Sequence, residues 1–347
     1  MPDWNKSKLS RIYFYQKVFL TIANSTDYVV MNGRIPQELQ DHWLERKWEF
    51  GLPISLINKN LPFIDSEAEL IEFGKVHSLV AGEFNLDENI WRSSAFLNSK
   101  VEQAKFSKLI SYGDEIIKIA YSPEDIIEFA ESTKCPIIIK EALSNSGSGH
   151  VVWQSAKENY KLNRIPYPAV MEVYQVNRIL DFGILIHVSR GQIELLDIAE
   201  MLIGKDFNYK GSFYYPSEKP QWYSKVKKLY NEIYPFAESW QKFIESENYE
   251  GPISIDGFLS EDGRQRLRSE INFRYTMGRI GYEIMLKRKL SKDWLQNIPK
   301  QTGIVILHSN QKIDPRPDYE LILSFNENDP WKIVYIEYRD QICRSIH

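Results

Sequence analysis

The stretch that decides the fold is Gly251–Arg279, which reads GPISIDGFLSEDGRQRLRSEINFRYTMGR. Pro252–Ser260 is apolar and rich in residues that favour strands, and Arg264–Phe273 alternates polar with apolar residues. The tripeptide Glu261-Asp262-Gly263 between them is typical of a turn. The stretch therefore predicts a β-hairpin.

The register of this hairpin decides which polar side chains share a face. With an odd-length loop centred on Gly263, Asp256 lies opposite Glu270, and Asn272 and Arg274 follow on the same face because side chains repeat every second residue. Two facing carboxylates repel, unless a cation lies between them. Oxygen donors from Asp, Glu and Asn suit Mg²⁺. The alternative is a solvated hairpin face with Lys or Arg neighbours.

Composition limits the classes of protein to consider. A chain of 347 residues with 43% hydrophobic content can bury a large core, in two or three subdomains. A net charge of −4, with no block of like charges, argues against nucleic acid or an acidic membrane as partner. No apolar run is long enough to span a bilayer. Cys135 and Cys343 form no CxxC pair, which indicates a reduced, cytoplasmic protein.

Residues 1–95 alternate strand-like and helix-like pieces. Asp27–Met31 and Pro53–Ile57 read as strands, and Pro36–Phe50 and Ser66–Phe73 as helices. This pattern predicts a small α/β layer that is weakly Rossmann-like. Because it lacks G-x-G-x-x-G, no dinucleotide is assigned to it.

A second signal lies where a buried strand ends in a lysine. Cys135–Lys140 is apolar and β-branched up to Lys140, and the small-residue loop Ser144–His150 follows before Val151–Trp153 resumes as a strand. A lysine leaving a buried strand needs an anionic partner to offset its lost hydration. The loop lets backbone N–H groups approach phosphate oxygens. The alternative is a flexible hairpin tip, and the P-loop motif is absent.

Asp256 followed by Glu-x-Asn-x-Arg, together with Lys140 and its glycine-rich loop, resembles the ATP-grasp superfamily. The resemblance covers about residues 96–290. It implies an α/β (α+β) fold in which two subdomains clasp ATP, preceded by a small Rossmann-like domain. The implied division is a pre-ATP-grasp domain at 1–95, the two ATP-grasp subdomains at 96–172 and 173–300, and C-terminal strands at 301–347.

The resemblance also implies roles for individual residues. In this family a lysine at the position of Lys100 reaches the phosphates, a hinge strand holds adenine, and an acidic residue, more often Glu than the Asp found here, binds ribose. The implied metal ligands are Asp256, Glu270 and Asn272. The implied ATP-binding residues are Lys100, Lys140, Ser146, Gly147, Ser148, Gly149, Glu172, Val173, Tyr174 and Asp181. The implied catalytic residues are Lys140, Arg274 and Lys210.

Gly204–Tyr215 falls where many enzymes of this family carry a mobile loop over the phosphates and the acceptor. Lys205 and Lys210 would then meet phosphate or a substrate carboxylate; an ordinary aromatic surface loop is the alternative. In the rest of the chain we expect helices at Lys100–Leu109, Ser122–Glu131, Lys219–Tyr249 and Ile280–Lys289. We expect strands at Glu115–Ala120, Ala169–Tyr174, Ile184–Ser189, Gln192–Ile203 (broken near Asp197), Gly303–His308, Tyr319–Phe325 and Trp331–Tyr338.

The resemblance implies an ATP-dependent carboxylate–amine ligase that works through an acyl phosphate, with ATP and Mg²⁺ (or Mn²⁺) as cofactors. Its partners would be a small-molecule or peptide carboxylate and an amine acceptor, and a homodimer is left open. A small-molecule kinase and a non-catalytic nucleotide-binding regulator are the alternatives. If Asp256 and Glu270 face each other only across a metal, Glu270→Gln should fold normally, with equal or higher stability when metal-free.

Overall fold

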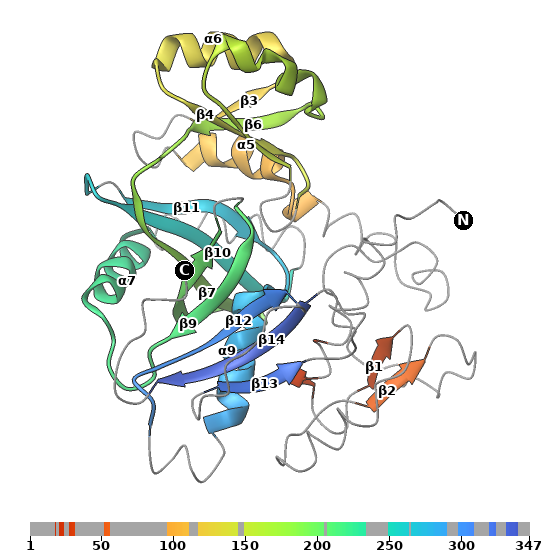
Figure 1. The fold of residues 1–347 in the computed structure, drawn as a ribbon, viewed down its shortest axis with the longest axis vertical. Helices are drawn as coiled ribbons and strands as arrows, with labels where there is room; N and C mark the ends of the chain where they lie inside the picture. The colour runs from red at the N-terminus through yellow and green to blue at the C-terminus, as the bar shows by residue number, and fades with distance from the viewer. Residues whose placement is uncertain are drawn as a thin grey trace. The chain divides into compact units, whose positions relative to one another are not determined.

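The computed structural model describes residues 18, 21–23, 28–31, 52–55, 96–110, 117–144, 149–204, 207–233, 249–263, 265–289, 298–308, 319–323 and 331–338. The described chain is mixed α/β with antiparallel sheets, which confirms the predicted fold class (Figure 1). It divides into two compact units. The first unit comprises 1–73, 210–220 and 277–347, and the second comprises 74–209 and 221–276. The division predicted at 1–95, 96–172, 173–300 and 301–347 stays a prediction.

The first unit contains a pair of parallel strands near the N-terminus. Strand β1 (Tyr28–Met31) pairs with β2 (Leu52–Ser55), which confirms both predicted strands. Parallel neighbours need a crossover connection, as the α/β pattern requires. The helices predicted at Pro36–Phe50 and Ser66–Phe73 lie outside the described residues.

The first unit also contains four antiparallel strands in the order β9, β12, β14, β13. Their bounds are Tyr209–Tyr214, Gln301–His308, Trp331–Tyr338 and Tyr319–Leu323, and helix α9 (Met277–Lys289) belongs to the same unit. The three C-terminal strands and the helix are thus confirmed. The helix lies close to the sheet, since the Tyr214 hydroxyl donates to the Gly278 carbonyl.

Strand β9 corrects the prediction of a loop through Gly204–Tyr215. From Tyr209 onward the chain is a strand, and its residues from Gly211 to Tyr214 are buried. A Cβ at Gly211 would lie 2.3 Å from the Ile304 carbonyl oxygen, so glycine is required where β9 meets β12. Phe213 and Tyr214, two of the aromatic residues that suggested a surface loop, are core residues of a sheet.

The second unit holds a four-stranded antiparallel sheet in the order β3, β6, β4, β5. The strands are Lys118–Ala120, Ala169–Val173, Ile137–Glu141 and His150–Trp153, and η2 (Ala156–Arg164) follows β5. Helix α6 (Pro123–Thr133) covers one face and α5 (Lys100–Ile110) the other (Figure 1). Ser122 begins α6 with a capping box, as its position in the sequence indicates.

Alternation along these strands sends apolar and charged side chains to opposite faces. Ile137, Ile139 and Met171 pack with α6 in one core cluster. Lys140 and Glu172 fall on the other face, the one that α5 shares. The lysine predicted to leave a buried strand therefore points to the α5 side of the sheet.

The second unit also contains the strand order β11, β10, β7, β8. These strands are Gln265–Asn272, Gly251–Ser260, Arg178–Ser189 and Gln192–Ile203, with helix α7 at Gln221–Ile233. Val226 and Tyr230 of α7 pack against the apolar face of these strands. The break predicted near Asp197 is a shift of register within a continuous strand. The remainder of the helical segment predicted up to Tyr249 lies largely outside the described residues.

The hairpin of β10 and β11 has the predicted pairing at its functional end. Asp256 lies opposite Glu270, and Ser254 opposite Asn272. Nearer the turn the register shifts, because Phe258 pairs with Arg266. The hairpin is therefore not the uninterrupted ladder centred on Gly263, and a bulge restores the pairing of the two carboxylates.

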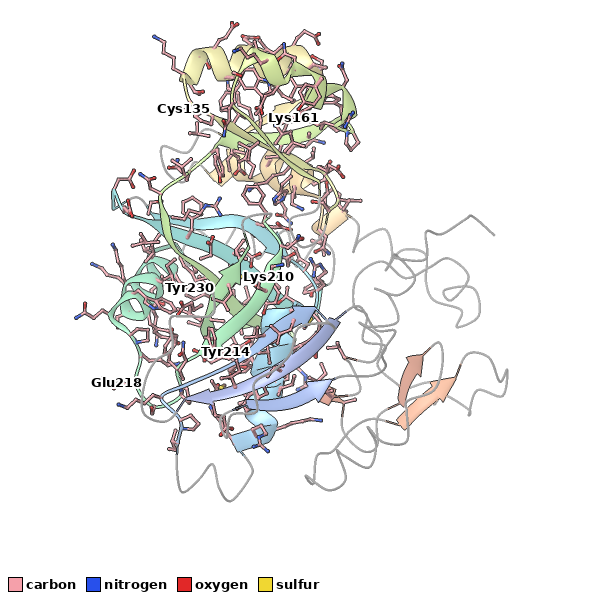
Figure 2. All side chains as sticks on the ribbon, viewed as in Figure 1. Cys135, Lys161, Lys210, Tyr214, Glu218 and Tyr230 are labelled. Atoms are coloured by element: carbon pink, nitrogen blue, oxygen red, sulfur yellow. The ribbon has the colours of Figure 1, made fainter. Side chains whose placement is uncertain are left out.

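Two surface properties of the sequence can be compared with the structure. None of the helices in the described ranges is long and apolar enough to cross a membrane. Cys135, just after α6, is an exposed free thiol (Figure 2).

Candidate nucleotide and metal site

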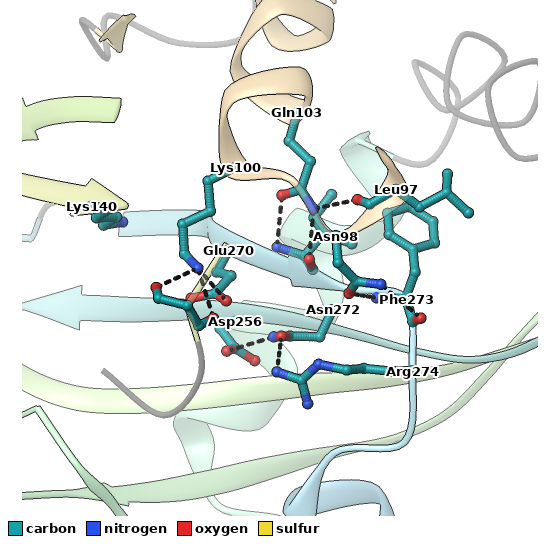
Figure 3. Close-up of polar contacts among 12 residues, drawn as sticks. Leu97, Asn98, Lys100, Gln103, Lys140, Asp256, Glu270, Asn272, Phe273 and Arg274 are labelled. Atoms are coloured by element: carbon teal, nitrogen blue, oxygen red, sulfur yellow. Dashed lines mark hydrogen bonds and ion pairs between the residues drawn. The ribbon is translucent and has the colours of Figure 1, made fainter. Parts of the chain in front are cut away.

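The polar face of the hairpin is a connected set of side chains (Figure 3). Ser254 Oγ donates to Asp256 Oδ1 at 3.1 Å, and Asn272 Nδ2 donates to Asp256 Oδ2 at 3.1 Å. Arg274 Nη2 donates to Asn272 Oδ1 at 2.8 Å. The predicted Asp, Asn and Arg thus lie together, and Ser254 is an additional member that the sequence did not single out.

The two opposed carboxylates have opposite pKa shifts. Burial, and then the charge of Glu270, raise the pKa of Asp256 from 3.8 to about 7, although Ser254, Arg274 and Asn272 oppose this. Burial also works against ionisation of Glu270, but Lys100 foremost, together with Lys140 and Arg274, holds its pKa below the ordinary value. Near neutral pH Glu270 is therefore ionised, and Asp256 is partly protonated.

Lys100 supplies the charge that keeps Glu270 ionised. Its Nζ lies 3.1 Å from Glu270 Oε1 and donates to both the carbonyl and the hydroxyl of Ser144. Only 5% of the Lys100 side chain is exposed. The expectation that Glu270→Gln leaves stability equal or higher is therefore reversed, since the variant would leave a buried lysine without its carboxylate.

Two polar residues beside Lys100 attach α5 to strand β11. Gln103 donates to the Leu97 and Ile271 carbonyls and accepts from the Ile271 N–H. Asn98 donates to the Phe273 carbonyl and accepts from the Phe273 N–H. These contacts place Lys100 over the hairpin. The sequence analysis missed both residues, because the sequence distinguishes them only by their positions on either side of Lys100.

Lys140 and Glu172 form a second buried ion pair. Lys140 Nζ lies 2.9 Å from Glu172 Oε2, and each side chain is 5% exposed. The anionic partner that the buried lysine requires is thus the glutamate of the hinge strand. The Tyr174 N–H after this strand donates to the Pro136 carbonyl at 2.7 Å, and Val173 pairs with Ile137. The adenine-binding roles of these hinge residues stay predictions.

The remaining predicted residues are distributed as follows. Gly149 has a φ of +77°, and a Cβ there would overlap the Glu141 carboxyl group, whereas Ser146–Ser148 lie outside the described residues. Asp181 is paired with Arg178 at 3.1 Å, and burial raises its pKa. Lys210 is an exposed residue of β9, in the first unit (Figure 2). The nucleotide and catalytic roles of these residues also stay predictions.

The donor set of the hairpin suits a hard divalent cation. Among the described residues no three His, Cys, Asp or Glu side chains cluster as metal ligands, so the set consists of two carboxylates and an amide. Mg²⁺ needs few protein ligands and takes its other ligands from water or phosphate. A cation beside Asp256 would also lower the raised pKa of this residue. The residues therefore fit the predicted metal.

No protein-family model and no curated protein matches this chain by sequence. Solved structures match it by fold. Phosphoribosylamine–glycine ligase from Thermotoga maritima matches with a TM-score of 0.56 and 16% identity, over 93% of this chain and 88% of that one. N5-carboxyaminoimidazole ribonucleotide synthetase from Thermus thermophilus gives 0.52 and 12%, over 78% and 76%.

Biotin carboxylase from Campylobacter jejuni, crystallised as a β-γ-ATP complex, gives a TM-score of 0.51 and 12% identity, over 76% of this chain and 68% of that one. All three are ATP-grasp enzymes. At these identities the likeness is one of fold. The chain has the ATP-grasp fold, as its motifs indicate.

Proposed function

We propose that this protein is an ATP-dependent carboxylate–amine ligase that forms a peptide-like bond through an acyl phosphate. The observation that carries the proposal is the opposed pair Asp256 and Glu270, with Lys100 placed over it, in an ATP-grasp fold. The similar structures support the class of reaction, because a glycine ligase and a carboxylase in complex with a form of ATP are among them. The carboxylate and the amine are small molecules or peptides of unassigned identity.

The charged side chains of this chain suit the binding of a polyphosphate. Lys100 and Lys140 are buried cations whose present partners are carboxylates, and phosphate oxygens can take over part of that pairing. Arg274, beside Asn272, would stabilise charge on the transferring group. When bound, Mg²⁺ (or Mn²⁺) held by Asp256, Glu270 and Asn272 would neutralise and orient the phosphates.

The proposed reaction has two steps. A carboxylate oxygen of the acid attacks the γ-phosphorus of ATP, the bond to the β–γ bridging oxygen breaks, and ADP leaves. The amine then attacks the acyl carbon, inorganic phosphate leaves, and the proton of the amine passes to solvent. Positioning and electrostatic stabilisation by Lys140 and Arg274 are the contributions expected of the protein.

The first test is nucleotide binding. Melting temperature is measured with increasing ATP at constant Mg²⁺, with adenosine and with chelator as controls. We expect a rise that grows with ATP concentration by mass action and is smaller without Mg²⁺. If well-folded protein shows no shift with ATP and Mg²⁺, the assignment fails.

The second test separates the ligase from its alternatives. Carboxylates are screened with a pool of amines for release of ADP and phosphate. Release that requires both an acid and an amine supports the ligase. ADP formation with a single acceptor indicates a kinase, and ATP binding without any turnover across the screen indicates a regulator.

A further inference from the structure

His150 lies beside Lys140 in the candidate site, and the sequence motifs give its side chain no role. It is the first residue of β5, directly opposite Lys140 on β4. Directly opposite residues share a face with Cβ atoms about 5 Å apart. His150 therefore lies on the α5 side of the sheet, beside the Lys140–Glu172 pair.

One ring nitrogen of His150 is buried and finds no partner among the described residues. Nε2 has no hydrogen bond in the part of the chain that the structure describes. Burial, and then the charge of Lys140, lower the pKa of His150 to about 4, so the imidazole is neutral at pH 7. A neutral imidazole has one donor and one acceptor nitrogen. A buried polar atom without a partner is costly, which is a reason to look for a ligand.

The His150 ring has an aromatic neighbour. The Phe207 ring stands edge-on to it at 6.1 Å between centroids, and edge-on to Tyr174 at 5.9 Å. Phe207 has a φ of 62°, in the left-handed region that is unfavourable for a non-glycine residue. Hydrogen bonds between Gly204 and both Phe207 and Asn208 close this turn. The strained turn thus brings Phe207 between the hinge and the end of the glycine-rich loop.

We propose that His150 is a nucleotide-binding residue whose Nε2–H donates to a phosphate oxygen of ATP, with Phe207 as its positioning residue. This inference rests on the proposed function. Lys100 and Lys140 carry only donors, so neither can accept a hydrogen bond from Nε2–H, and both are paired with carboxylates. A phosphate oxygen is an acceptor and therefore matches an Nε2–H. A neutral donor selects for the geometry of the phosphate chain without adding charge.

The test is calorimetric titration of ATP, ADP and adenosine into wild type and three variants. His150→Phe keeps the ring and removes both nitrogens, and His150→Gln returns a donor at similar reach. His187→Phe is the matched control, because His187 Nδ1 is also buried with no hydrogen-bond partner among the described residues, but His187 lies on β7, opposite Glu194. We expect His150→Phe to weaken ATP and ADP about tenfold, with most of the affinity retained in His150→Gln and the control.

Phe207→Leu tests the positioning role. We expect a loss of ATP affinity of about threefold, and no further loss when it is combined with His150→Phe, because residues that act through one contact are not additive. A purely structural Phe207 would instead weaken ATP binding equally in both backgrounds.

The outcomes distinguish this inference from the proposed function. Wild type that does not bind ATP overturns both. If wild type binds ATP and His150→Phe binds it with unchanged affinity, only the role of His150 is overturned. The same holds if His150→Phe loses as much affinity for adenosine as for ATP. If His150→Phe does not fold, the ¹⁵N resonances of the wild-type imidazoles decide: a His150 Nε2 that shows no N–H on ADP binding overturns the proposal.

Discussion

The second unit buries charge in two places, and the two places solve the problem differently. On the four-stranded sheet, Lys140 and Glu172 are opposite charges 2.9 Å apart, so the pair is neutral by itself. On the hairpin of β10 and β11, Asp256 and Glu270 are two acids opposite each other. Lys100 balances one of them, and the other responds through a pKa raised to about 7.

The two charge clusters should therefore contribute differently to stability and to binding. The Lys140–Glu172 pair is complete without a ligand, so disrupting it should first be seen in folding. In the hairpin, Asp256 loses its proton only against the repulsion of the Glu270 carboxylate, so a cation bound there would relieve that repulsion. The hairpin is therefore where metal and function should depend most on each other.

The largest effect is expected from Lys140→Met, which removes the cation paired with the buried Glu172 carboxylate. We expect the free energy of unfolding to fall by about 3–5 kcal/mol. Urea denaturation of the nucleotide-free protein measures this loss. The double variant Lys140→Met/Glu172→Leu should recover much of it, because it removes both charges. Equal stability of the single and double variants would mean that the ion pair does not form.

Next in size is Glu270→Gln. We expect turnover to fall at least about a hundredfold, the scale of one lost electrostatic stabiliser. Its metal-free stability should also fall, because Lys100 loses its carboxylate. ATP turnover and urea denaturation of the same preparation measure both, with a substrate pair from the screen.

The matched control for Glu270→Gln is Asp256→Asn, at the opposite position of the ladder. It removes the carboxylate whose pKa is raised, so at pH 8 its metal-free stability should rise while turnover falls. Retained turnover in both variants would show that the hairpin is only a solvated sheet face. A gain of stability in Glu270→Gln would show that Lys100 does not depend on this carboxylate.

A smaller effect is expected from pH. The pKa of Asp256 is raised in the folded protein, so its destabilising contribution is fully present above about pH 7 and is lost as pH falls toward the unfolded value of 3.8. Stability with chelator should therefore increase by about 2 kcal/mol between pH 8 and pH 5, relative to Asp256→Asn. Saturating Mg²⁺ should reduce this dependence. Parallel curves for wild type and variant would contradict the raised pKa.

The sequence predicted the hairpin because alternation and turn chemistry are local signals. The same local signals supported Lys140 at the end of its strand and the start of α5 at Lys100. Sequence could not predict that Lys100 neutralises Glu270 or that Glu172 pairs with Lys140, because these contacts join residues 170 and 32 positions apart. Strand β9 was missed for a related reason, since its aromatic residues lie against β12 and α9, which are distant in the sequence.

The smallest effect is expected from Ser254→Ala, and it tests the hairpin most directly. Ser254 Oγ donates to Asp256 Oδ1 and thereby favours the ionised carboxylate. Without that donor the pKa of Asp256 should rise further, so stability should fall by about 1 kcal/mol at pH 8 and by less at pH 5, where the acid is protonated. Urea denaturation at the two pH values measures the difference. In the Asp256→Asn background the loss should no longer depend on pH, because no titrating group is left to respond. An equal loss at both pH values in the wild-type background would mean that Ser254 only packs in the sheet and does not set the charge of Asp256.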